Sequence, residues 1–264
     1  MTNTNNKPID KSLRCAVVAG GTSGVGLAAA HRFADTGWGR VVILGRDESR
    51  GKSAEEQLVA ATPEADIAFI PVDLLDPRST AEVFDRIRSE HGRIDALVTA
   101  THGGSTPTLL GDIALEQIKN LLSNQVVSVF HACRAVLPVM QEQGSGSIIT
   151  ISSDAAKVPT PGETIVGAAM SAIMMFSKTL AIEAKRHGIR VNSILPSVVT
   201  GTESFERVLQ DPFAQKVFGK IDRMAALGLP DPDDLASLII FLASEESARI
   251  TGQAISINGG ISAV

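Results

Sequence analysis

The stretch that decides the fold is Ala16-Val17-Val18-Ala19-Gly20-Gly21-Thr22-Ser23-Gly24-Val25-Gly26. An apolar run of strand length passes directly into glycines, and these open an amphipathic segment. A helix that begins in this way leaves backbone N–H groups unpaired and directed at one point. A pyrophosphate would satisfy those groups and lie at the positive end of the helix dipole. The stretch therefore predicts a phosphate-binding strand–turn–helix unit, against the alternative of a glycine-rich turn without a ligand.

Short apolar runs alternate with helix-length segments along the whole chain. We expect strands at residues 15–19, 41–44, 67–71, 96–100, 147–152, 190–195 and 254–257. We expect helices at 24–36, 48–61, 79–91 and 115–141, and loops at 73–77 and 196–212. This alternation is typical of a parallel sheet with helices on both faces. We predict an α/β fold, a Rossmann-type doubly wound parallel sheet of about seven strands, with a polar tail over residues 1–11 and a single domain over 12–264.

Composition limits the class of protein. Hydrophobic residues make up 44% of the 264 and aromatic residues only 4%, so the core must be aliphatic, which suits a parallel sheet. The net charge of −5 is well mixed and gives no reason to expect a nucleic acid or membrane partner. The N-terminus lacks an apolar signal core, and the uncharged stretch 164–177 is too short to span a bilayer. We expect a soluble cytoplasmic protein in which Cys15 and Cys133 are buried free thiols.

The end of the second expected strand bears on the choice of dinucleotide. An acidic residue at this place typically binds the 2′-hydroxyl of the adenosine ribose. Here Gly45 occupies it and Arg46 follows. A guanidinium can pair with a 2′-phosphate in a charge-assisted contact worth about 1.5–3 kcal/mol. The sequence thus predicts NADP(H) in preference to NAD(H), the alternative being a solvated arginine.

At this point the chain resembles the short-chain dehydrogenase/reductase family over essentially residues 12–260. The glycine loop matches its Gly-x-x-x-Gly-x-Gly, and Asp73-Leu74 matches the pair that holds the adenine ring in the family. Segments 146–153, 190–196, 251–253 and 258–260 match its fifth and sixth strands and its C-terminus. Loop chemistry and resemblance together predict these cofactor-binding residues: Gly20, Thr22, Ser23, Gly24, Val25, Gly26, Arg46, Asp73, Leu74, Ala100, Pro196 and Val199.

The catalytic positions depart from the family pattern. The family has a tyrosine thirteen residues after the active-site serine and a lysine four residues further on. Counted from Ser153, these positions hold Val166 and Met170, and the chain contains no tyrosine at all. The asparagine of the fourth helix aligns with Gln125, with Asn124 one residue earlier. We therefore expect a non-standard active site.

Several polar side chains are candidates for the remaining chemistry. Ser153, Gln125 and His102 are the catalytic candidates, Thr164 lies within plausible reach, and no metal site is predicted. Two of them have a plainer interpretation. His102 is then a loop histidine that is hydrogen-bonded to the backbone, and Ser153 keeps its place at the end of the strand without a catalytic role. Asp154 is expected to be a solvated turn residue. His131 is expected to serve packing or an interface.

An apolar helix and an apolar lid segment bear on which partners and which substrate the protein binds. Met170, Met174 and Met175 are expected in a core or subunit contact, or in the floor of a hydrophobic substrate site. Segment 203–227 resembles the substrate lid of the family. By resemblance we expect a homo-oligomer (dimer or tetramer), or a hetero-oligomer with an active paralogue. The predicted ligand is a small, apolar molecule.

Three functions are compatible with these residues. The first is an NADP(H)-dependent reductase that acts on an activated alkene or an imine, because such reactions need less help from a tyrosine than reduction of a simple ketone does. The second is a catalytically silent pseudoenzyme or structural subunit that keeps the fold and the cofactor. The third is a non-redox catalyst in the retained pocket. Hydride transfer, its absence despite cofactor binding, or product formation without a change in nicotinamide absorbance would distinguish them.

Overall fold

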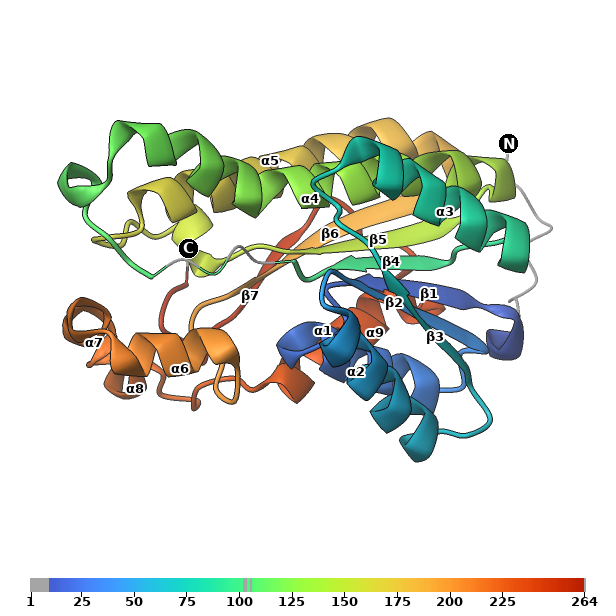
Figure 1. Ribbon diagram of the computed structural model, residues 1–264, viewed down its shortest axis with the longest axis horizontal. Coiled ribbons are helices and arrows are strands. Elements are labelled where there is room, and N and C mark those ends of the chain that lie inside the picture. Colours follow the sequence, from blue (N-terminus) through green and yellow to red (C-terminus); the bar gives the residue numbers. More distant parts are fainter. Residues whose placement is uncertain (1–9, 102–103, 105, 264) are drawn as a thin grey trace.

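The computed structural model describes residues 10–101, 104 and 106–263, and these form a seven-stranded parallel sheet of order β3-β2-β1-β4-β5-β6-β7 (Figure 1). The strands are β1 (Cys15–Ala19), β2 (Arg40–Gly45), β3 (Asp66–Pro71), β4 (Ala96–Thr99), β5 (Gly146–Ile151), β6 (Ile189–Pro196) and β7 (Ala254–Ile257). All neighbouring pairs run parallel. The predicted fold class is confirmed, and the expected strand boundaries differ from these by at most one residue at each end.

Helices cover both faces of the sheet. On one face lie α3 (Pro77–His91), α4 (Leu115–Gln143) and α5 (Thr164–Ala184); on the other lie α1 (Gly24–Asp35), α2 (Glu48–Ala61) and α9 (Pro232–Ala243) (Figure 1). Short 3-10 turns connect the elements: η1 (Lys11–Leu13), η2 (Leu110–Asp112), η3 (Asp154–Ala156), η4 (Lys185–His187) and η5 (Glu245–Ser247). Connections of this kind place the loops after the strands at one edge of the sheet, where doubly wound folds bind ligands.

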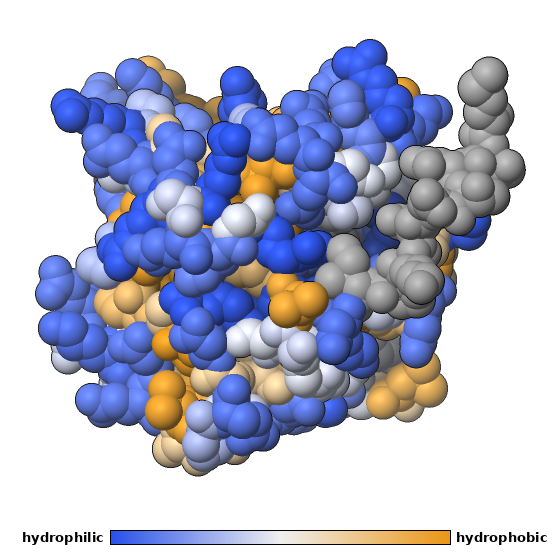
Figure 2. All heavy atoms as spheres, turned by 90° about the vertical axis from the view of Figure 1, so that its right-hand side faces the viewer, coloured by the Kyte–Doolittle hydropathy of each residue, from blue (hydrophilic) through white to orange (hydrophobic). Residues whose placement is uncertain are grey.

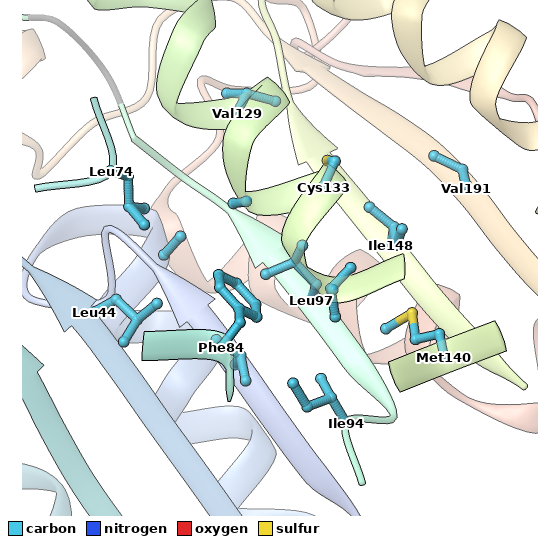
Figure 3. Close-up of a cluster of buried hydrophobic side chains, with 14 of the residues drawn as sticks. Leu44, Leu74, Phe84, Ile94, Leu97, Val129, Cys133, Met140, Ile148 and Val191 are labelled. Atoms are coloured by element: carbon cyan, nitrogen blue, oxygen red, sulfur yellow. The ribbon is translucent and has the colours of Figure 1, made fainter. Parts of the chain in front are cut away.

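The core is aliphatic, as the composition requires. Figure 3 shows Phe84 of α3, Leu97 of β4 and Ile148 of β5 among the buried side chains between the sheet and one helical layer. Both cysteines are free and buried. Burial raises the pKa of the Cys133 thiol to about 12, and burial together with the nearby Asp95 raises that of Cys15 to about 12. The thiols are therefore packing groups.

The expected loop over residues 196–212 is wrong in its second half. Three short helices follow β6, namely α6 (Glu203–Gln210), α7 (Pro212–Phe218) and α8 (Ile221–Met224). The side chain of Thr202 accepts a hydrogen bond from the Phe205 N–H, and that of Asp211 accepts one from the Ala214 N–H. These caps pair N–H groups in the first turns of the two helices, and the prediction of a loop did not take this local signal into account. The three helices lie at the left end of the molecule in Figure 1.

The surface differs between one end of the molecule and helix α5. The right-hand end of the molecule is mainly hydrophilic, with its apolar atoms in small separate groups (Figure 2). By contrast, α5 carries exposed Met175 and Ile182. By length and composition alone, the segment Thr164–His187 could also cross a membrane, and only a third of its apolar window is buried. In this structure α5 packs against α4, β5 and β6.

Candidate functional site

The glycine loop after β1 is shaped by close backbone approaches. Gly20 and Gly24 have φ of 79° and 51°, a region that favours glycine. A β-carbon added at Gly26 would lie 2.1 Å from the Gly20 carbonyl oxygen. The Gly20 N–H donates a 2.9 Å hydrogen bond to the Leu44 carbonyl oxygen. The loop is thus held tightly between β1, β2 and the start of α1.

The start of α1 is open to an anionic ligand. Ser23 is its N-cap residue and makes no side-chain cap hydrogen bond, whereas the side chains of Asp47 and Asp76 cap α2 and α3. Uncapped first-turn N–H groups and the helix dipole together favour a phosphate. Residues 22–26 could hold the pyrophosphate of a dinucleotide.

A side chain at the end of β2 would press on Thr22. A β-carbon added at Gly45 would lie 2.8 Å from Cγ2 of Thr22, a half-buried residue of the glycine loop. Arg46, the next residue, is exposed, and within the described part of the chain no salt bridge engages it. This corner therefore offers a guanidinium and a hydroxyl in place of a carboxylate.

The end of β3 is an ordered turn. The Asp73 side chain is exposed and accepts a hydrogen bond from the Leu75 N–H at 3.0 Å. Leu74 is buried, and its carbonyl oxygen lies 2.9 Å from Nδ1 of His131 on α4. The half-buried His131 thus ties α4 to the backbone at Leu74, and its expected part in packing or an interface stays a prediction.

Thr202, just before the lid segment, lies beside the glycine loop. Thr202 Cγ2 is 3.6 Å from the position of a β-carbon at Gly24, and the Thr202 hydroxyl donates to the Val199 carbonyl at 2.8 Å. Glu203 forms a 3.0 Å ion pair with Arg50 of α2. Thr202 and, through its bond to Val199, the connection after β6 therefore lie near the glycine loop, and the roles of Pro196 and Val199 in cofactor binding stay predictions.

A cavity of about 440 Å³ opens between the β4–α4 connection, α4 and the start of α5. Its described lining is Gly104, Thr106, Thr108, Asp112, Ile113, Gln117, Asn120, Leu121, Asn124, Gln125, Gly162, Ile165 and Val166. No Lys or Arg occurs in this described lining. The cavity is of a size for a small molecule, and at its edge the Arg207 guanidinium lies 3.1 Å from the position of a β-carbon at Gly104.

Four carboxamides of α4 face this cavity, and only two were considered in the sequence. Gln117, Asn120 and Asn124 are spaced i, i+3, i+7 and so share one helical face, next to the buried Gln125. Read along the helix, that spacing could have revealed the wall of the cavity. The wall adds amide and hydroxyl groups to the apolar side chains of Ile113, Leu121, Ile165 and Val166, and the apolar ligand stays a prediction.

The two positions of the missing acid and base have different surroundings. Val166 is half-buried and lines the cavity. Met170 is 1% exposed and belongs to the core, and its backbone carbonyl accepts a 2.9 Å hydrogen bond from the Ser152 hydroxyl. Val166 therefore faces the cavity, whereas Met170 is a core residue, which is one of the two interpretations given for it above.

Asp154 corrects a prediction. It is 4% exposed rather than solvated. Its carboxylate accepts hydrogen bonds from the Ser262 hydroxyl at 2.5 Å, the Asn258 amide at 3.0 Å and the Ser256 hydroxyl at 3.3 Å. The neighbouring Ser153 is half-buried and accepts a 3.2 Å bond from the Ala155 N–H. Asp154 therefore anchors the end of the chain beside the serine.

Glu163, which sequence reasoning missed, is the N-cap residue of α5. Burial raises the pKa of its carboxyl group, and a hydrogen bond with Thr160 acts against that shift. No sequence signal marks it, because its burial depends on the folded surroundings.

The structure unites some of the predicted catalytic residues and separates others. Gln125 and Val166 line the same cavity, while Ser153 and Met170 do not belong to its described lining. Thr164 is exposed at the start of α5. His102 lies outside the described residues. In the described chain, no three His, Cys, Asp or Glu side chains are grouped to hold a metal ion.

Comparison with known proteins identifies the family. The sequence model of the family described as enoyl-(acyl carrier protein) reductase matches residues 19–262. The 3-oxoacyl-[acyl-carrier-protein] reductase FabG of Chlamydia muridarum is 31% identical over 251 residues, which cover 94% of this chain and 97% of that protein. With this glycine loop and this sheet, the chain belongs to the short-chain dehydrogenase/reductase family of oxidoreductases.

Two further similarities are informative about cofactor and site. The NADPH-dependent reductase BacG of Bacillus subtilis is 28% identical, with 94% of this chain and 98% of that protein covered. An NADPH-bound short-chain oxidoreductase of Pseudomonas aeruginosa, described as containing an atypical catalytic centre, is 29% identical with a TM-score of 0.85. It covers 97% of this chain and 99% of that chain.

Proposed function

We propose that this protein is an NADPH-dependent reductase with a non-standard active site that reduces an activated C=C or C=N bond rather than a simple ketone. The observation that carries the proposal is the pairing of an open dinucleotide loop with a ligand cavity whose wall presents Val166 at the position of the family's acid. A polarised alkene or an iminium accepts a hydride with less acid assistance than a carbonyl needs.

In this proposal the residues of the glycine loop bind the pyrophosphate through their N–H groups. Arg46 and Thr22 bind the 2′-phosphate, Asp73 and Leu74 the adenine, and Ala100, Pro196 and Val199 border the nicotinamide half. The similarity to BacG and to the NADPH-bound Pseudomonas protein supports this choice of cofactor. When bound, NADPH supplies the hydride. Ser153 and Gln125 would orient the substrate by hydrogen bonding.

Cofactor selectivity gives a sharp test at β2. Arg46→Ala is expected to weaken NADPH binding by about 10- to 100-fold and leave NADH binding unchanged, because only the 2′-phosphate contact is lost. Gly45→Asp alone is expected to impair binding of both dinucleotides, since its β-carbon would press on Thr22 Cγ2 at 2.8 Å. Adding Thr22→Ser removes that methyl group and is expected to restore NADH binding.

Calorimetric titration with NADPH and NADH measures these effects. Arg249→Ala, at an exposed arginine remote from β2, is the control and should behave as the wild type. Equal affinity of the wild-type protein for NADH and NADPH would contradict the proposed selectivity.

The reaction itself is tested with NADPH deuterated at its transferable position. Cyclohexenone, a cyclic imine such as pyrroline, and ethyl acetoacetate are the alkene, imine and ketone probes. Deuterium is expected in the product of the alkene or the imine and not in that of the ketone. NADPH binding without transfer to any probe would favour the silent subunit, and a product formed without nicotinamide oxidation would favour non-redox catalysis.

The proposed protein is cytoplasmic and forms a homo-oligomer. Two buried free thiols fit a reducing compartment, in accord with the cytoplasm. The exposed Met175 (58%) and Ile182 (63%) of α5 suit a contact between copies of the chain. Light scattering is expected to give the mass of a dimer or tetramer, and Ile182→Glu to lower it. A monomer would leave a hetero-oligomer with an active paralogue as the alternative.

A further inference from the structure

We propose that the 440 Å³ cavity takes a neutral substrate with an amide-type group, a lactam or a carboxamide, on the edge that faces α4. The inference rests on the proposed function and deepens it by naming the class of substrate at the same site. It starts from the amide wall, which is the row of the Gln117, Asn120 and Asn124 side chains in the cavity lining. Each of these side chains offers both donors and an acceptor, and none carries a charge.

The groups of the amide wall are available to a ligand. Gln117, Asn120 and Asn124 are exposed, and within the described part of the chain no hydrogen bond engages their side chains. At the rise of an α-helix, the row from Gln117 to Asn124 is about 10 Å long. Asn120 and Asn124 are one turn apart, so their amides are neighbours. One amide can donate to a ligand carbonyl while the other accepts from the ligand N–H.

The side of the cavity that α5 forms is apolar. Ile165 and Val166 line it from the first turn of α5, and Leu121 of α4 extends this apolar surface. Gly162, just before α5, is packed under the lid, because a β-carbon there would lie 2.6 Å from the Phe213 ring of α7. A ligand with one polar and one apolar edge suits both sides of the cavity, and it places its apolar edge against Val166.

The charges around the cavity favour a neutral ligand. Asp112 is the one charged residue of the described lining, and the Arg207 guanidinium lies at the cavity edge beside Gly104. One charge of each sign leaves no excess to bind a carboxylate or an ammonium group. An amide group of the ligand uses a donor and an acceptor of the wall at once. A lactone or a ketone can only accept, so the wall distinguishes a lactam from both.

The first test measures binding without turnover, in the complex with NADP⁺, which has no hydride to give. The probes are the unsaturated six-membered lactam, the corresponding lactone and cyclohexenone, which share one conjugated C=C–C=O group. Ligand-observed NMR titration is expected to show about 10-fold tighter binding of the lactam, because only its N–H finds an acceptor in the wall. Equal affinities for the three probes would overturn the proposal.

Three variants locate the recognition on α4. Asn120→Leu and Asn124→Leu keep about the same side-chain volume without the amide, so each should abolish the lactam preference while cyclohexenone binds at least as well. Gln141→Ala, at an exposed glutamine of α4 outside the described lining, is the control and should keep the preference. The ratio of the lactam and cyclohexenone affinities is the readout, which a general loss of folding would not change. A lactam preference that survives both leucine substitutions together would overturn the assignment to the amide wall.

Deuterium transfer from labelled NADPH separates this proposal from the proposed function. Transfer to cyclohexenone or pyrroline by a wild-type protein without a lactam preference would overturn the substrate recognition alone. A lactam preference in a protein that transfers deuterium to none of the probes would support the recognition and overturn the reductase.

Discussion

Replacing Asp154 by alanine is expected to lower the free energy of unfolding by about 3–5 kcal/mol, one of the two largest effects that we predict. Three donors, from Ser256, Asn258 and Ser262, bond to this buried carboxylate, and alanine leaves them without it. A buried donor deprived of its partner costs about 1–3 kcal/mol. Urea denaturation of the purified variant measures the change.

Two matched variants distinguish the loss of the Asp154 hydrogen bonds from the loss of a negative charge in general. Asp154→Asn keeps an acceptor oxygen and is expected to fall between alanine and the wild type. Asp85→Ala, at an exposed aspartate of α3, should change stability by less than about 0.5 kcal/mol. If Asp154→Ala were no more destabilising than Asp85→Ala, the bonds to the chain end would not contribute to stability.

Gly26→Ala is expected to destabilise the fold by about 3 kcal/mol and to weaken NADPH binding at least 100-fold. The new β-carbon would sit 2.1 Å from the Gly20 carbonyl oxygen, a distance that only a backbone shift can relieve. Overpacking typically costs about 1–3 kcal/mol, and here the shift moves the loop that we propose binds the pyrophosphate. Denaturation and calorimetry follow the two effects separately.

Gly111→Ala is the control for the added methyl group. Gly111 has no heavy atom within 4 Å of the new β-carbon and does not have a positive φ. We expect it to retain the stability and the NADPH affinity of the wild type. Wild-type affinity in Gly26→Ala would mean that the turn at Gly20 does not shape the binding loop.

The sequence could predict the parts of this protein that depend on local order. β1 and the glycine loop are consecutive, so apolar run, turn and helix start can be read from eleven residues. The sheet follows because a crossover between parallel strands needs a helix, and the alternation shows it. Short capped helices such as α6 carry a weaker signal, since one threonine cap decides where the helix begins.

The rest depends on long-range contacts that spacing does not encode. Asp154 looked like a solvated turn because its partners lie 102 to 108 residues away. Glu163 owes its raised pKa to burial, which is visible only in the folded chain. The amide wall of α4 was in principle readable from helical spacing. The family pattern, however, marks only Gln125 and its neighbour Asn124 on this helix.

The contact between Gly45 and Thr22 constrains how cofactor preference could change during evolution. An aspartate at Gly45 meets the Thr22 methyl group at 2.8 Å, so that substitution is unfavourable while the threonine remains. Loss of the Thr22 methyl group removes this contact and keeps the hydroxyl, so an aspartate becomes easier to accommodate. The two changes are therefore epistatic. A lineage with this loop meets less steric resistance to an NAD-type β2 end when the change at position 22 comes first.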